Sequence, residues 1–185
     1  MNALEILQKR QSVGKLQAPA PDNKICEALI GSAIRAADHG NLTPWRFIFI
    51  RDSGLEKLGQ VFLAAGLQNK PEMSVDEQTR LLSLPLRAPL IITVVARVQN
   101  HPKIPVHEQL FSAAAAAQNI LNAAYASGFG AIWRTGEIAS DPYVAKEMGL
   151  SAEEQIIGFI YLGTPVQPLG EAKPKATSDF FSYWP

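Results

Sequence analysis

Near the N-terminus, two cations and a hydroxyl stand within six residues: Arg10, Ser12 and Lys15, with Gln11 and Gly14 between them. An arginine offers a bidentate fork, a serine a short hydrogen bond and a lysine a point charge, so this group is suited to holding a phosphate. The glycine allows the backbone to turn tightly there. The alternative is that Arg10 and Lys15 only complement the dipole at the C-terminal end of a preceding helix.

A second polar segment runs from Arg35 to Trp45 and includes Asp38, His39 and Asn41. Functional residues often lie on loops that rigid elements hold in place, and this loop is dense in hydrogen-bonding groups. A turn that stops a helix would explain Asp38 and Asn41, but it would not explain Arg35 or His39.

The third segment, residues 128–136, is bracketed by glycines and is predicted to be a loop that presents Trp133, Arg134 and Thr135. The alternative is that Trp133 is an ordinary core residue. The Gly128-Phe-Gly start resembles a dinucleotide fingerprint, but it follows a predicted helix, and Trp133 stands where the third glycine belongs. We therefore exclude a Rossmann phosphate loop.

Other chemistries find little support. The sequence contains no His-Glu-x-x-His, Gly-x-Ser-x-Gly or Walker motif. His101, His107 and Glu108 lack the spacing of a metal site and are interpreted as solvated loop and helix-start residues, so no metal is predicted. Cys26 is interpreted as a small buried hydrophobe in preference to a reactive thiol.

The chain has 185 residues, of which 47% are hydrophobic and 18% charged. This composition predicts one globular domain, residues 1–185. Lys plus Arg equal Asp plus Glu at 17 each, so the charge does not favour nucleic acid. The N-terminus does not resemble a signal peptide, and the longest apolar run, residues 88–96, is too short to span a membrane. We expect a cytoplasmic protein.

These segments must be positioned by a mixture of helices and strands. Periodicity and capping signals predict helices at 2–10, from the N-cap Asp22, from a capping box at Ser53 to about Ala65, at 74–84, 106–127 and 141–149. Apolar, β-branched runs predict strands at 46–51, 90–96 and 155–162, the middle one buried on both faces. From about residue 163 to 185, a region rich in Pro, Gly and Lys predicts an extended C-terminal arm.

The predicted helix at 106–127 is about 33 Å long. The side chains in its middle are small on every face, because residues 113–117 are all alanine. We expect it to be buried centrally or packed against a second chain. The predicted fold class is α+β, a small central sheet covered by helices.

In order and spacing, the three polar segments resemble the nitroreductase family of FMN-dependent oxidoreductases, in its short branch. The resemblance extends over almost the whole chain. Its motifs are Ala3-Leu-Glu with Arg10 and Ser12, Arg35-Ala-x-Asp38-His39 with Pro44-Trp45, residues 87–96, Gly128-Phe-Gly with Ile132-Trp-Arg134, and Gly158-Phe with residues 161–165.

The resemblance implies a three-layer nitroreductase-like fold with a mixed or antiparallel sheet, an intertwined homodimer, and two FMN sites at the subunit interface. It assigns FMN contacts to Arg10, Gln11, Ser12, Lys15, Arg35, His39, Asn41, Trp133, Arg134 and Thr135. Of these residues, Arg35, His39 and Asn41 would come from the partner subunit. It places Lys15 near the pyrimidine end of the flavin, where a cation stabilises negative charge. It places NAD(P)H contacts at Ala123, Ala124, Tyr125, Ala126, Ser127 and Gly128.

The activity that the resemblance implies is hydride transfer from NAD(P)H through flavin to a nitroaromatic, a quinone or a similar small acceptor, with ping-pong kinetics and no catalytic nucleophile. The chain departs from the family pattern at Gln11, where a second arginine is common. It also has Asp38-His39 where Ser-Ser is common. Longer relatives have basic phosphate contacts near the C-terminus, and the candidates for that role in this chain are Lys173 and Lys175. A flavin protein without NAD(P)H turnover and a cofactor-free binding module remain as alternatives.

Overall fold

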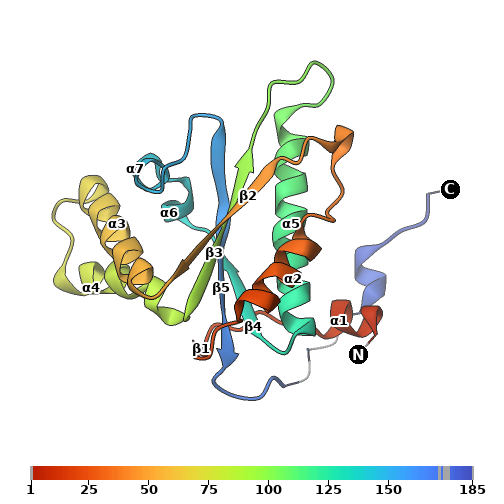
Figure 1. The fold of residues 1–185 in the computed structure, drawn as a ribbon, viewed down its shortest axis with the longest axis horizontal. Coiled ribbons are helices and arrows are strands. Elements are labelled where there is room, and N and C mark those ends of the chain that lie inside the picture. Colours follow the sequence, from red (N-terminus) through yellow and green to blue (C-terminus); the bar gives the residue numbers. More distant parts are fainter. Residues whose placement is uncertain (1, 171, 173–175, 185) are drawn as a thin grey trace.

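The computed structural model describes residues 2–170, 172 and 176–184. Its centre is a five-stranded sheet (Figure 1) in which every neighbouring pair of strands is antiparallel. The strands are β1 (Leu16–Gln17), β2 (Trp45–Arg51), β3 (Leu90–Arg97), β4 (Gly130–Arg134) and β5 (Glu154–Pro165). The order is β1–β5–β3–β2, and β4 also pairs with β5.

Helices cover both faces of this sheet, which gives three layers (Figure 1). On one side lie α1 (Ala3–Lys9), α2 (Asn23–Ala33) and α5 (Val106–Ala126). On the other lie α3 (Ser53–Asn69), α4 (Val75–Ser83), α6 (Glu137–Ser140) and α7 (Pro142–Glu147). Short 3-10 turns are η1 (His39–Asn41), η2 (Pro85–Arg87) and η3 (Thr177–Phe180). The chain is thus an α+β protein, as its sequence predicts.

Two hydrophobic cores result from the two-residue period of the strands. In β3, Leu90, Ile92 and Val94 pack on the side of α2 and α5, whereas Ile91 packs on the side of α3. Every residue of β3 before Arg97 is buried. The prediction that this strand is covered on both faces is therefore confirmed.

The predicted helix ends are mostly confirmed, because capping chemistry is local. The Asp22 carboxylate accepts from the Ile25 N–H at 2.8 Å at the start of α2. The Asp141 carboxylate accepts from the Tyr143 N–H at 2.8 Å at the start of α7. Gly128 follows α5 with φ of 82°.

Three expectations were wrong in their details. Asp52, with φ of 52°, holds the N-cap position of α3, so Ser53 is already helical and does not form a capping box, and the helix continues to Asn69. Residues 163–165, predicted to begin the C-terminal arm, belong to β5. Residues 130–134, predicted as loop, form β4, because the free edge of β5 offers them a ladder of hydrogen-bond partners.

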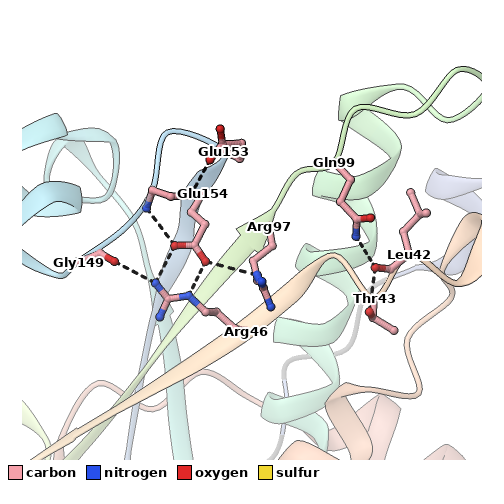
Figure 2. Close-up of polar contacts among 9 residues, drawn as sticks. Leu42, Thr43, Arg46, Arg97, Gln99, Gly149, Glu153 and Glu154 are labelled. Carbon is pink, nitrogen blue, oxygen red and sulfur yellow. Dashed lines mark hydrogen bonds and ion pairs between the residues drawn. The ribbon is translucent and has the colours of Figure 1, made fainter.

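An ion-pair network joins the adjacent strands β2, β3 and β5 at one end of the sheet (Figure 2). The Arg46 guanidinium on β2 donates to both carboxylate oxygens of Glu154 on β5, with Nε–Oε1 at 2.5 Å and Nη2–Oε2 at 2.8 Å. Arg97 on β3 adds a longer ion pair at 3.6 Å. Only 10% of the Glu154 side chain is exposed. The hydrogen bond from Arg46 lowers the pKa of Glu154 from 4.5 to about 2.

This network predicts a pH-dependent contribution to stability. Because the folded-state pKa of Glu154 is depressed, its contribution is complete above the unfolded pKa near 4.5 and is lost as the pH falls towards about 2. Glu154→Gln should lower the free energy of unfolding by about 1.5–3 kcal/mol at neutral pH, and the difference from the parent should shrink below about pH 5. Urea denaturation at a series of pH values measures this difference.

The matched control is Glu153→Gln, since Glu153 is the exposed neighbour and its carboxylate accepts a hydrogen bond from the Ser151 hydroxyl at 2.9 Å. A difference between Glu154→Gln and the parent that stays constant as the pH falls would contradict the assignment.

Candidate functional site

The N-terminal residues 10–15, called here the basic corner, lie along the outer edge of β4. The Val13 N–H donates to the Ala131 carbonyl at 2.9 Å. A Cβ on Gly14 would lie 3.5 Å from Nη2 of Arg134. β1 follows the basic corner directly and pairs with Thr164 and Pro165 at the end of β5. The structure therefore brings the first and third predicted segments together within one chain.

Two arginines at this junction have buried N–H groups that lack a partner. Arg10 ends α1, where its backbone N–H donates to Ile6 at 3.1 Å. Its Nη1, and Nε of Arg134, are buried and have no hydrogen-bond acceptor among residues 2–170, 172 and 176–184. Buried donors are satisfied in nearly all folded proteins. The two guanidinium groups therefore mark a place where a polar or anionic ligand fits.

The other residues of the basic corner differ in their surroundings. The Gln11 side chain donates to the Gly170 carbonyl, which ties the start of the C-terminal segment to this corner. Ser12 and Lys15 are exposed. Lys173 and Lys175, the candidates for a further phosphate contact, lie outside the described residues.

Trp133 and Arg134 point to opposite faces of the sheet, as neighbours in a strand do. Trp133 is half-buried on the side of α5, and its indole N–H donates to the Ile157 carbonyl at 3.2 Å. Arg134 lies over the Tyr161 ring, 5.6 Å from its centroid. Burial raises the pKa of Tyr161, and the charges of Arg134 and Arg87 offset part of that shift. Thr135 is exposed at the end of the strand.

The second polar loop, residues 35–45, lies elsewhere. His39 Nδ1 is 2.6 Å from Glu108 Oε2 in the first turn of α5, whereas β4 lies near the other end of this helix (Figure 1). The helix is about 31 Å long. The loop also leads into β2, which is separated from β4 by β3 and β5, or about 14 Å at the usual strand spacing. Within one chain, Arg35, His39 and Asn41 therefore lie apart from the basic corner.

This second loop has a strained backbone. Asn41 and Thr43 have positive φ of 53° and 49°. The Asp38 carboxylate accepts from the Thr43 N–H at 2.6 Å, in keeping with the alternative that Asp38 helps to form a turn. His39 and Arg35 remain exposed.

A cavity of about 540 Å³ opens beside the end of β4, on the face of the sheet that carries α3 and α4. Residues 132–138 form one wall, and Arg80 of α4 and Arg87 of η2 form part of another. Sequence reasoning assigned no role to these two arginines. The sequence signal that could have indicated them is their spacing of seven residues, which would place both arginines on one face of a continuous helix.

The residues proposed to contact NAD(P)H form the last turn of α5 and its cap. Tyr125 and Gly128 line a cleft of about 470 Å³ together with residues 165–169. Ala124 is fully buried, and its carbonyl accepts the N–H groups of Ser127 and Phe129.

Other candidate sites are occupied by structural contacts. His101 Nδ1 accepts from the Ile104 N–H at 3.1 Å, and the described residues contain no group of three or more metal-ligating side chains. Burial raises the pKa of the Cys26 thiol, in keeping with a small buried hydrophobe. Among the described helices, none has the length and apolar character required to cross a membrane.

A family model described as the nitroreductase family matches residues 7–164. The chain belongs to the nitroreductase family. It is similar to the Escherichia coli K12 protein named Putative NAD(P)H nitroreductase YdjA, with 39% identity over 169 residues and 89% of each chain covered. A Haemophilus influenzae protein named Putative NAD(P)H nitroreductase is 32% identical over 185 residues, which cover 99% of this chain and 100% of that relative.

Solved structures confirm the nitroreductase fold. A nitroreductase-like family protein from Bacillus cereus has a TM-score of 0.81 at 21% identity, covering 99% of this chain and 96% of that one. A Desulfovibrio desulfuricans protein, described as a putative nitroreductase in complex with FMN, has a TM-score of 0.76 at 22% identity, covering 100% and 98%.

The position of Trp133 depends on the missing side chain of Gly158, because a Cβ there would overlap the indole ring. Gly158→Ala should displace Trp133 and lower the free energy of unfolding by about 1–3 kcal/mol. Urea denaturation measures the energy. The indole N–H signal of Trp133 in NMR spectra should shift, since its bond to Ile157 is disturbed.

Gly31→Ala is the matched control. Gly31 is exposed in α2, and a Cβ there would meet nothing within 4 Å, so alanine should be neutral or stabilising. If both variants are equally stable and the Trp133 signal does not move, the close packing at Gly158 is wrong.

Proposed function

We propose that this chain is an FMN-dependent oxidoreductase that takes a hydride from NAD(P)H and reduces a nitroaromatic, a quinone or a similar small acceptor. The observation that carries the proposal is the pair of buried, unpartnered guanidinium N–H groups of Arg10 and Arg134, where the basic corner meets β4. Family membership and the FMN complex of a protein with the same fold support it.

The residues of the basic corner fit a phosphorylated flavin. Arg10 would provide its free Nη1, and Ser12 an exposed hydroxyl, for the phosphate and ribityl chain. Gly14 lies beside Arg134, because a Cβ on it would be 3.5 Å from Nη2. Trp133, Arg134 and Thr135 would form the opposite wall, and Lys15 would stand at the pyrimidine end of the ring.

A partner subunit would complete the site. Arg35, His39 and Asn41 are separated from the basic corner within one chain, so they can contribute only from a second copy. Large apolar side chains on α1 and α5 support such a dimer, because Leu4 and Phe111 are each 66% exposed and Leu7 is 60% exposed. Exposed large apolar side chains are common where two chains make contact.

Bound FMN would supply the hydride and electron chemistry, and the protein would supply binding, orientation and electrostatics. The Lys15 ammonium would stabilise negative charge at the pyrimidine end of the site. Tyr125 and Gly128, at the end of α5, would contact the nucleotide. The donor and the acceptor would use one cleft in turn, and no side chain would act as a nucleophile.

The experiment that tests the function is the absorption spectrum of the freshly purified protein, followed by anaerobic mixing with NADH or NADPH. A yellow protein that loses its colour with either nucleotide and regains it with a nitroaromatic or quinone is expected. A yellow protein that neither nucleotide bleaches would instead be a flavin protein without NAD(P)H turnover. A colourless protein that cannot be loaded with FMN would refute the proposal.

Arg10→Ala should weaken FMN binding by about 1.5–3 kcal/mol, or roughly ten- to a hundredfold in Kd, because a hydrogen bond to a charged group is lost. The measurement is a fluorescence titration of the apoprotein with FMN. Arg51→Ala is the control, since Arg51 lies on β2, away from the basic corner, and its guanidinium donates to the Asn23 side chain at 3.3 Å. An Arg10→Ala variant that binds FMN as tightly as the control would show that Arg10 does not hold the flavin.

A further inference from the structure

The cavity beside the end of β4 has the size and lining of a small-molecule site. Its volume is about 540 Å³, within the usual range of ligand pockets. Phe62, Phe159 and Tyr161, each at most 3% exposed, contribute aromatic surface, and Leu81 and Leu84 of the α4 region add aliphatic surface. Such walls suit the flat apolar body of an aromatic molecule.

Three arginines from three separate elements converge on this cavity: Arg80 of α4, Arg87 of η2 and Arg134 of β4. The lining contains one carboxylate, Glu137, which is exposed, so the formal charge of the lining is positive. Across the described ranges 2–170, 172 and 176–184, none of the three arginines forms an ion pair. Three guanidinium groups lining one cavity create a positive potential that favours an anionic ligand there.

Arg134 connects this cavity to the proposed flavin site. It is held over the Tyr161 ring at 5.6 Å, and its Nη2 faces Gly14 of the basic corner. The cavity therefore begins where the proposed flavin site ends, and a molecule in it would lie next to the flavin.

We propose that Arg80 and Arg87 bind the anionic group of the electron acceptor, so that the enzyme prefers acceptors with a carboxylate or a similar anion on an aromatic ring. This inference rests on the proposed function and names its substrate class. The ring packs on the apolar wall, while the two exposed guanidinium groups at the rim accept the anion through charge-assisted hydrogen bonds. Arg134 remains with the flavin.

The test compares two acceptors that differ in charge, 4-nitrobenzoate and 4-nitrobenzyl alcohol. In the two-electron reaction, the nitro compound, NAD(P)H and a proton give the nitroso compound, NAD(P)⁺ and water. The double variant Arg80→Gln with Arg87→Gln should lower the ratio of kcat/KM for the acid over the alcohol by about tenfold or more, mainly through KM for the acid. Arg51→Gln, a matched substitution outside the cavity, should keep the parent's ratio.

Binding is measured as well, so that the result does not depend on turnover. Calorimetry of the flavin-loaded parent with 4-nitrobenzoate should show binding that the double variant loses, and that added salt weakens. A parent that binds the acid but is not bleached by NAD(P)H would refute the proposed function and leave this anion site intact.

Three outcomes would overturn the inference. The acid-to-alcohol ratio and the binding of 4-nitrobenzoate could be the same in the parent and the double variant. The double variant could lose FMN, which would assign the arginines to the flavin itself. The preference for NADPH over NADH in flavin reduction could change while the acid-to-alcohol ratio stays constant. This result would assign Arg80 and Arg87 to the phosphate of the nucleotide. Thermal unfolding of each variant verifies that it is folded.

Discussion

The pairing of β4 with the edge of β5 is the interaction on which the candidate site depends. β5 is long enough to pair with β3, with β4 and, at its end, with β1. The single bond from Val13 to Ala131 then attaches the basic corner to the outer side of β4. Arg10 and Arg134, which are distant in sequence, are thereby brought to one junction, and their buried N–H groups are left for a ligand. Loss of this pairing would separate the two halves of the site.

The same sheet explains why the proposed flavin site would need a second copy of the chain. The second polar loop precedes β2, at the opposite edge of the sheet, and contacts the start of α5 through His39 and Glu108. A rigid sheet and a helix of 21 residues keep these two regions apart. A second copy of the chain would bring its own second polar loop to the basic corner. It would pack on the exposed apolar side chains of α1 and α5. In this account the central alanine-rich helix serves both the core and the contact between subunits.

Local signals predicted much of this structure, and nonlocal contacts account for what they missed. Asp22, Asp141 and Gly128 act on their own helix ends, so their roles could be derived from spacing alone. β4 could not, because a glycine-flanked run of five residues becomes a strand only when β5 offers an edge. The junction of the first and third segments was predicted through family resemblance. The cavity around Arg80 and Arg87 was missed, since it exists only after α4 folds back over the sheet.

The most direct test of the central claim is a crystal structure of the protein grown with FMN. The account predicts the phosphate beside Arg10 and Ser12, the ring against residues 133–135, and His39 of a second copy on the same ligand. FMN bound away from the junction of the basic corner with β4, or held entirely by one chain, would contradict it.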